Sequence, residues 1–335
     1  MKRRSEFFKY GMLFSVVFLL ACQSTPPPPG MGDARCNDVA ERQFLNVLTV
    51  NLLFSEVVDR DERLEDIADF AVDNNVDVLL LQEVVSGALA KTENSAQDLR
   101  EILRGKHNVD YNIRTAFEIG LPGLLGVANA VLSRCEIEFS QVKRLPLSSE
   151  LEFDGQVIRI SRNVLMVRLK IPEQGKINIY DTHLCASCEI EEREEQLDEL
   201  LDFVKRMDMN MPGDNPSVLG GDFNIDRYDN EGAEKFLYEK IIAAGFTDAY
   251  AEFIIASSGG QETLDTLCED EDNADEHCTV GVSELNGPNA RRIDYIFTRR
   301  PSAIRDAKVV FNTLVNDSET TVSDHGGVLT SMHSP

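Results

Sequence analysis

A carboxylate and an amide stand two residues apart at the end of a short apolar run in this chain. The run Ser217-Val218-Leu219 predicts a buried strand, and Gly220-Gly221 allow the backbone to turn sharply after it. This turn would bring Asp222 and Asn224 to the same side of the chain. An acid can move a proton, and an amide is a fixed dipole that can hold an anion. An Asx turn in an ordinary strand-to-helix loop fits the same residues, so the stretch alone leaves a turn and a reaction site open.

Polar side chains also come at the ends of other predicted strands. The segment from Phe44 to Asn51 is apolar and β-branched and ends in an amide, and the strand from Val76 to Leu81 is followed by Gln82-Glu83. The segment from Ile177 to Leu184 carries His183 near its end. A single histidine in such a place is more often structural than catalytic. Polar residues at several strand ends, however, build a site along one edge of a sheet.

Two acids and a second histidine complete the set near the C-terminus. Asp294 lies inside the apolar segment from Arg292 to Phe297, and it should have a partner because burying a lone carboxylate is costly. Asp324 and His325 come just before the last predicted strand, Val328 to Met332. The candidate residues are therefore Asn51, Glu83, His183, Asp222, Asn224, Asp294, Asp324 and His325.

These residue types fit a hydrolysis that uses a metal ion. Carboxylate and amide oxygens suit a hard cation such as Mg²⁺, with Mn²⁺ or Ca²⁺ as alternatives, and Mg²⁺ keeps waters that a substrate phosphate can replace. A histidine held by a carboxylate can act as a general base at neutral pH. A second imidazole and an amide can hold phosphoryl oxygens as charge builds on them.

The motifs around these residues resemble those of the endonuclease/exonuclease/phosphatase superfamily, which includes deoxyribonuclease I, inositol polyphosphate phosphatases and neutral sphingomyelinases. Any one motif is weakly specific, whereas the full set in the expected order is strongly so. The resemblance implies an α/β fold, a four-layer sandwich of two mixed β-sheets packed face to face with helices on both outer faces. The motifs are Thr49-Val50-Asn51, Leu81-Gln82-Glu83-Val84, Asn129-Ala130-Val131-Leu132-Ser133, Asp181-Thr182-His183-Leu184, Gly221-Asp222-Phe223-Asn224, Ile293-Asp294-Tyr295 and Ser323-Asp324-His325.

The resemblance also implies a role for each residue. Glu83 resembles the principal metal ligand of the family, with Asn51 beside it and Asp324 on or near the metal. On the helix after the histidine, Arg193 and Gln196 fit the family pattern as structural supports.

The remaining residues would carry the reaction itself. By resemblance, Asp222 positions or deprotonates the attacking water and Asn224 binds phosphoryl oxygens. His183 would hydrogen-bond the phosphate or assist the leaving group. Asp294 would orient His325, the second candidate for general base, and the division of labour between Asp222 and His325 stays open.

The first residues predict export from a bacterial cell. A basic start, an apolar run from Tyr10 to Leu20 and the sequence Leu19-Leu20-Ala21-Cys22 are similar to a lipoprotein signal peptide over residues 1–21. Cys22 would then be lipidated, and residues 22–40, rich in proline, would tether the domain of residues 41–335 to the envelope, by resemblance the outer membrane. An ordinary signal peptide or an uncleaved anchor, with Cys22 incidental, is the alternative.

Charge narrows the substrate class. The chain of 335 residues has a net charge of −25, which disfavours strong binding to a nucleic-acid backbone. We therefore expect a phosphate-ester substrate, a phospholipid or another small phosphodiester, and a monomeric protein that reaches the membrane through its N-terminal lipid. The Thr182-His183-Leu184 motif and the run Glu192 to Gln196 are similar to neutral sphingomyelinases. A deoxyribonuclease I-like endonuclease is the second hypothesis, and a catalytically silent surface lipoprotein with a binding role is the third.

Six cysteines besides Cys22 suggest disulfides in an exported protein. The first expected pair is Cys268 with Cys278, which bracket a very acidic segment. Cys185 and Cys188 could pair or bind a metal. Structural bridges are favoured, because no second close pair of cysteines or histidines supports a zinc site.

Overall fold

The computed structural model describes most of the chain after the predicted tether. The residues described are 33–53, 59–121, 123–146, 149–153, 156–211, 213, 215–229, 232–258, 260, 268, 274–281, 290–300, 303–312 and 321–335. The predicted signal peptide, Cys22 and the proline-rich stretch lie outside these residues. Within the described part of the chain, no helix is both long enough and apolar enough to cross a membrane.

The first sheet has six strands and contains one parallel pair. Strands β1 and β2 run parallel, and the other neighbours in this sheet run antiparallel. Its order is β13 (Ile304–Val310), β14 (Gly327–His333), β1 (Phe44–Asn51), β2 (Val78–Ser86), β4 (Leu125–Ser133) and β3 (Asn112–Leu121).

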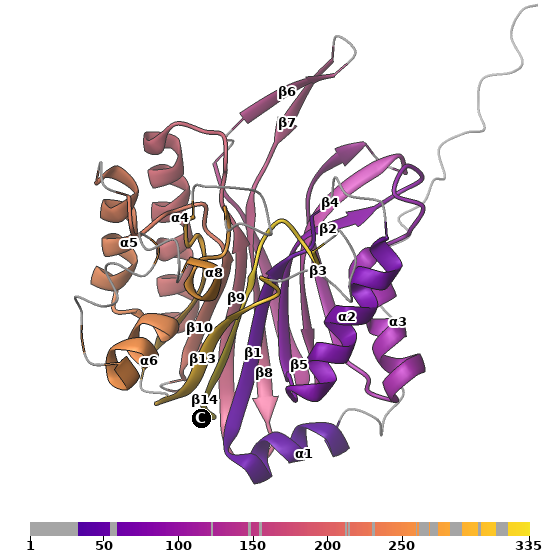
Figure 1. The fold of residues 1–335 in the computed structure, drawn as a ribbon, viewed down its shortest axis with the longest axis vertical. Helices are drawn as coiled ribbons and strands as arrows, with labels where there is room; N and C mark the ends of the chain where they lie inside the picture. Colours follow the sequence, from indigo (N-terminus) through magenta and orange to yellow (C-terminus); the bar gives the residue numbers. More distant parts are fainter. Residues whose placement is uncertain are drawn as a thin grey trace, which may run out of the picture.

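The second sheet also has six strands around one parallel pair, β9 with β10. A separate hairpin of β6 (Ser149–Phe153) and β7 (Gln156–Ile160) projects beyond the sheets (Figure 1). The order of the second sheet is β11 (Thr247–Asp248), β12 (Asp294–Arg299), β10 (Ser217–Asp222), β9 (Gly175–His183), β8 (Asn163–Ile171) and β5 (Glu136–Arg144).

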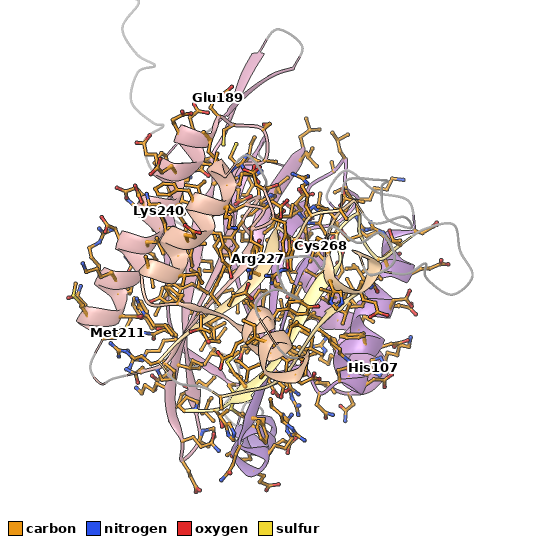
Figure 2. All side chains as sticks on the ribbon, turned by 60° about the vertical axis from the view of Figure 1, so that its left-hand side comes forward. His107, Glu189, Met211, Arg227, Lys240 and Cys268 are labelled. Carbon is orange, nitrogen blue, oxygen red and sulfur yellow. A yellow bond between two sulfur atoms is a disulfide. The ribbon has the colours of Figure 1, made fainter. Side chains whose placement is uncertain are left out.

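The two sheets pack face to face, with helices outside each of them (Figure 1). Apolar side chains from β1 and β2 meet those of β8 and β9 in a core between the sheets. Helices α2 (Arg60–Asp73) and α3 (Ser95–His107) cover the outer face of the first sheet, and α4 (Ile190–Asn210) and α5 (Ala233–Ala243) cover that of the second. Figure 2 shows Met211, after α4, and His107, at the end of α3, on opposite sides of the molecule. The predicted four-layer α/β sandwich is confirmed.

Helix α1 (Asp33–Arg42) changes the predicted boundary between tether and domain. The sequence assigned residues 22–40 to a tether, but α1 packs beside β1 and β8. The disulfide between Cys36 and Cys135 ties this helix to the start of β5. The folded domain therefore begins by Asp33. Helix α1 is polar overall, and it docks on the core through the buried side chains of Cys36 and Val39.

The second disulfide is the predicted one, between Cys268 and Cys278. The expected bridge between Cys185 and Cys188 is wrong, because neither sulfur belongs to a disulfide in the described residues. Instead, the Cys188 thiol donates a hydrogen bond to the carbonyl oxygen of Cys185 at 3.5 Å. The two short helices α6 (Ala249–Ser258) and α8 (Ala274–His277) complete the described elements.

Candidate active site

Three of the predicted site residues form one row across the second sheet. Asp222, the last residue of β10, pairs with His183 of β9 on one side and with Asp294 of β12 on the other. All three side chains are buried. The register of the sheet thus brings together residues that are far apart in the sequence.

Gly221 lets Asp222 reach this row. Its φ of +133° is a conformation that side chains rarely adopt, and a Cβ atom there would lie 2.0 Å from the carbonyl oxygen of Thr182. Only glycine allows β10 to approach β9 this closely. After it, the buried Phe223 packs edge-on against Tyr295 and Phe297. This aromatic packing holds the backbone directly after the carboxylate.

The Asp222 carboxylate is surrounded by donors. Its Oδ1 accepts a hydrogen bond from the backbone N–H of Asn224 at 2.9 Å, and its Oδ2 accepts one from Asn51 Nδ2 at 3.2 Å. His183 Nε2 lies 3.5 Å from the same Oδ2. Burial and the neighbouring Asp294 nevertheless raise the pKa of Asp222 to about 7, with the charge of His325 opposing the rise. An acid with such a pKa can exchange a proton near neutral pH.

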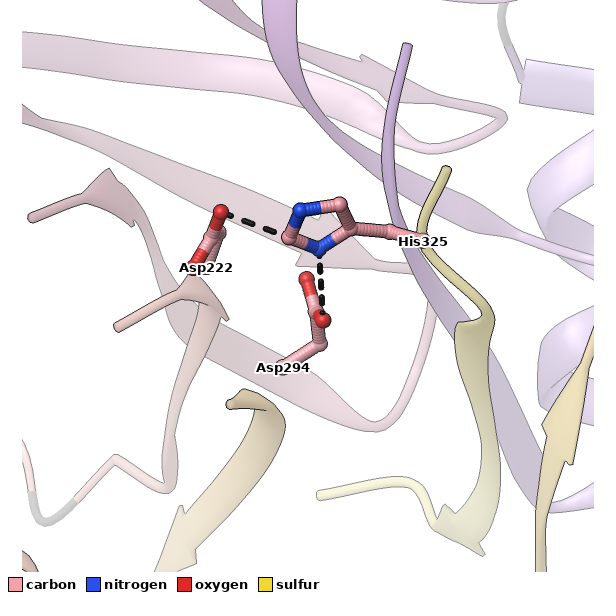
Figure 3. A group of neighbouring side chains, drawn as sticks. All are labelled: Asp222, Asp294 and His325. Carbon is pink, nitrogen blue, oxygen red and sulfur yellow. Dashed lines mark hydrogen bonds and ion pairs between the residues drawn. The ribbon is translucent and has the colours of Figure 1, made fainter. Parts of the chain in front are cut away.

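His325 reaches this row from the first sheet, just before β14. Its Nδ1 is 2.9 Å from Asp294 Oδ2 and 3.8 Å from Asp222 Oδ2 (Figure 3). Burial alone would lower the pKa of His325, but the carboxylates of Asp294 and Asp222 outweigh it and raise this pKa to about 10. The predicted partner of the buried Asp294 is therefore His325.

Asn224 lies where the sequence placed it, beside Asp222. Its backbone has a φ of +50°, and its side-chain Nδ2 donates to the carbonyl oxygen of Leu184 at 3.0 Å. One amide hydrogen is thus used to hold the loop after β9. Because the amide nitrogen carries two hydrogens, the second can donate to a phosphoryl oxygen.

Asn51 comes to the site from the first sheet. It ends β1, is buried, and its Oδ1 accepts the backbone N–H of Leu53 at 3.0 Å. Because its Nδ2 also donates to Asp222, one side chain joins the two sheets at the edge that carries the site.

Glu83 does not end a strand as the sequence suggested. Strand β2 continues to Ser86 through an irregularity between Leu81 and Val84. Glu83 sits in this bulge with a φ of +55° and is half-buried. A bulge re-aims a side chain, so Glu83 leaves the inward and outward alternation of β2. Asp324 is also half-buried, and it accepts a hydrogen bond from Ser323 Oγ at 3.3 Å.

The donor set fits a hard cation. Asp222, Asp294 and His325 offer ligand atoms that all lie within 4.8 Å of one another. Asp294 Oδ1 is buried and has no hydrogen-bond partner among the described residues. Buried carboxylates that crowd together in this way need a positive charge, and oxygen-rich sites favour Mg²⁺, Mn²⁺ or Ca²⁺. The predicted ligands Glu83 and Asp324 do not belong to this group of three.

Sequence reasoning missed Arg162 and Glu118. Arg162 NH1 is 3.0 Å from His183 Nδ1 and 3.0 Å from Glu118 Oε2. Burial and then the Arg162 charge hold the pKa of His183 well below its usual range. The available signal was a single basic residue, Arg162, between the two apolar segments Val157 to Ile160 and Val164 to Ile171.

The supports after His183 are confirmed as structural. Arg193 Nε donates to the carbonyl oxygen of Cys185 at 2.9 Å, and its NH1 pairs with Glu234. Gln196 Oε1 accepts the backbone N–H of Cys185 at 3.0 Å. These contacts fix the loop that follows His183.

Two mixed sheets with acids, amides and imidazoles along their shared edge define a class of hydrolases that act on phosphate esters. The family model described as the Endonuclease/Exonuclease/phosphatase family matches residues 48–325. The chain belongs to this family, whose members hydrolyse phosphodiester or phosphate ester bonds. No curated protein matches the chain.

Solved structures show the same fold. An endonuclease/exonuclease/phosphatase family protein from Leptotrichia buccalis has 22% identity and a TM-score of 0.59, covering 86% of this chain and 99% of its own. A mannosyl-6-phosphatase from Bacteroides thetaiotaomicron has 17% identity and a TM-score of 0.59, covering 86% and 99%. The TDP2 protein of D. rerio, complexed with a single-strand DNA product, has 19% identity and a TM-score of 0.57, covering 87% and 99%.

Proposed function

We propose that the protein is a metal-dependent phosphodiesterase that hydrolyses a phospholipid or another small phosphodiester by in-line attack of an activated water. The row of His183, Asp222 and Asp294, closed by His325, carries this proposal. The row places the Asp222 carboxylate beside the two imidazoles, with Asp294 next to His325. Such a group can move a proton and hold an anion in the same place.

In the proposed reaction, a water oxygen bonds to phosphorus while the bond to the leaving ester oxygen breaks. Asp222 accepts the proton of the water, because the pKa of His325, raised to about 10, keeps that ring protonated at neutral pH and unable to accept it. Asp294 keeps His325 oriented through the 2.9 Å contact. Asn224 and His183 hold the phosphoryl oxygens as negative charge builds on them.

The residues that would hold a divalent cation are Glu83, Asn51 and Asp324, of which Asn51 contacts Asp222 and Asp324 directly precedes His325. When bound, the cation would neutralise phosphate charge and polarise the phosphoryl oxygens. The buried acids Asp222 and Asp294 support this part of the proposal, because their charges are otherwise balanced by His325 alone among the contacts described above.

Charge supports a small substrate over duplex DNA. A protein with a net charge of −25 repels a polyphosphate backbone at long range. A small diester or a single headgroup presents far fewer charges than DNA. For this reason we place nuclease activity second.

We also propose that the protein is exported and anchored to the outer membrane through lipidated Cys22. The basic start, the apolar run and the residues before Cys22 support this location. Mass spectrometry of the protein from a bacterial envelope fraction tests it. A mature chain that begins at acylated Cys22 would support the proposal, and a chain with an unmodified Cys22 would reject it.

A substrate panel tests the reaction class. The purified protein is given a chromogenic phosphodiester, a chromogenic phosphomonoester, phospholipid vesicles and supercoiled plasmid, each with Mg²⁺ and with a chelator. We expect the diester and the lipid headgroup to be released only with the metal. Plasmid nicking at lower enzyme concentration would favour the nuclease, faster monoester hydrolysis would favour a phosphatase, and no turnover of any substrate would favour a silent binding protein.

Variants connect the activity to the site. Glu83→Ala and His325→Ala should each lower turnover by roughly 100-fold or more without unfolding the protein. His107→Ala is the matched control, because His107 ends α3 and pairs with Asp69 of α2 on the outer layer of the first sheet, away from the row. Full activity in either site variant would reject the assigned roles.

A further inference from the structure

Arg162 joins a buried acid to one of the two site histidines. It stands between the β6–β7 hairpin and β8, and its side chain is only 12% exposed. The same nitrogen, NH1, lies 3.0 Å from Glu118 Oε2 and 3.0 Å from His183 Nδ1. One guanidinium therefore contacts both a carboxylate and an imidazole.

Glu118 is held so that it must face Arg162. It lies in β3 where the pairing with β4 is irregular, and it is buried although the preceding Phe117 is 48% exposed. Asn129 Nδ2 donates to its Oε1 at 3.1 Å. Burial raises the pKa of Glu118 to about 7, and the Arg162 charge opposes this rise. A buried carboxylate with a built set of donors fixes the direction of the guanidinium.

The contact with Arg162 decides which nitrogen of His183 carries the proton. A guanidinium has five donor hydrogens and no acceptor. His183 Nδ1 must therefore accept the hydrogen bond, and the proton of the neutral ring must be on Nε2. That Nε2 is the atom 3.5 Å from Asp222 Oδ2. A protonated Nδ1 would place two donors against each other in a buried space.

We propose that Glu118 and Arg162 are positioning residues that lock His183 in the neutral Nε2–H tautomer. His183 is then a fixed donor toward the reacting group, and it cannot take a proton from the attacking water. This consequence for turnover rests on the proposed phosphoesterase function, whereas the tautomer itself does not.

A purely structural salt bridge would not need the histidine. Elsewhere in this domain, buried carboxylates are paired without an imidazole, as Asp77 is with Arg42 and Arg134. At Arg162, the nitrogen that meets Glu118 is also the nitrogen that meets His183. The proton position on His183 is therefore the property that separates a positioning role from a structural one.

The test measures this proton position in the full chain. Two-bond ¹H–¹⁵N correlation spectra distinguish protonated from unprotonated ring nitrogens, and loss of signals in His183→Gln assigns them. We expect the wild-type ring to carry its proton on Nε2. Arg162→Lys keeps a cationic donor and should keep this tautomer, whereas Arg162→Gln can also accept a hydrogen bond and should give a mixture.

Turnover of the chromogenic phosphodiester gives the second readout. Arg162→Gln should lower kcat by about tenfold or more with a smaller change in KM, because a wrong tautomer removes a donor needed in the transition state. Arg162→Lys should recover most of this loss, and Glu118→Gln should fall between them. Arg114→Gln, which changes an exposed arginine on β3, is the matched control.

Two results would overturn the proposal. One is a wild-type His183 with its proton on Nδ1, which can be seen even if the variants fail to fold. The other is an Arg162→Gln protein with an unchanged tautomer. If no phosphate ester is hydrolysed but the tautomer follows Arg162, the positioning pair stands and the proposed function fails.

Discussion

His183 and His325 approach the same carboxylate oxygen of Asp222, but their other contacts are with groups of opposite charge. His183 Nε2 lies 3.5 Å from Asp222 Oδ2, and His325 Nδ1 lies 3.8 Å from it. Arg162 contacts the first imidazole and Asp294 contacts the second. Burial and then the Arg162 charge lower the pKa of His183, whereas the carboxylates of Asp294 and Asp222 outweigh burial and raise the pKa of His325 to about 10. Asp222 therefore faces a neutral imidazole, His183, and a charged imidazole, His325.

Asp294→Asn tests this difference between the two rings. The amide keeps the shape of the side chain but removes the charge that raises the pKa of His325. We expect this pKa to fall from about 10 toward the ordinary value of 6.5, as read by NMR titration. Turnover should fall by roughly 100-fold or more, because His325 loses its orientation as well as its charge.

The control for this variant is Asp306→Asn, on the exposed face of β13. It should leave both the His325 titration and turnover unchanged. An Asp294→Asn protein whose His325 still titrates near pH 10 would show that Asp294 does not set the charge of this ring.

Gly221→Ala should prevent normal folding, because the added Cβ would overlap the carbonyl oxygen of Thr182 at 2.0 Å. Gly105→Ala, in the exposed part of α3, meets nothing within 4 Å and should stabilise the protein by about 0.5–1 kcal/mol. Urea denaturation of the two variants measures both effects. Equal stabilities would contradict the close approach of β10 and β9.

The two disulfides should differ in their contribution to stability. Cys36–Cys135 closes a loop with a sequence separation of 99, and Cys268–Cys278 closes one with a separation of 10. The chain-entropy relation gives about 4.7 kcal/mol for the long loop and about 2.7 kcal/mol for the short one. Paired Cys→Ser variants, compared by chemical denaturation, measure the difference, and a larger loss from the short loop would contradict the entropic account.

Much of the fold was predictable because its strands and helices are periodic. β1 begins and ends at the residues the sequence indicated, and the ordered motifs identified the row of His183, Asp222 and Asp294. The polar residue types at the strand ends were enough to predict that these residues lie along one edge of a sheet. The register that places His183 and Asp294 on either side of Asp222 is set by the pairing of strands that are distant in the sequence, and strand patterns alone do not determine it.

The parts that sequence reasoning missed depend on contacts between distant segments. Helix α1 has a polar composition, and its place depends on the bond between Cys36 and Cys135. The bulge at Glu83 has no marker such as glycine in the strand. Arg162 is an ordinary basic residue until the fold places it between Glu118 and His183.

The last prediction concerns a buried ion pair outside the site. Arg292 is fully buried, and its NH2 lies 2.6 Å from Asp248 Oδ2. Burial alone would raise the pKa of Asp248, but the Arg292 charge outweighs it, and the pKa is lowered from 3.8. A carboxylate with a depressed folded pKa adds stability above its unfolded pKa and loses it as the pH falls through the folded value.

Asp248→Asn should therefore destabilise the protein at pH 7 by roughly 3–5 kcal/mol, because it leaves the Arg292 charge buried without its carboxylate. The difference from wild type should shrink below pH 3.8, where Asp248 of the unfolded wild-type chain is protonated and the folded carboxylate begins to follow. Asp61→Asn, whose side chain is 88% exposed, is the control and should change stability little at any pH. Denaturation curves across the acid range measure this. If the loss of unfolding free energy in Asp248→Asn does not change with pH, the pair stabilises the fold through packing and not through the charge on Asp248.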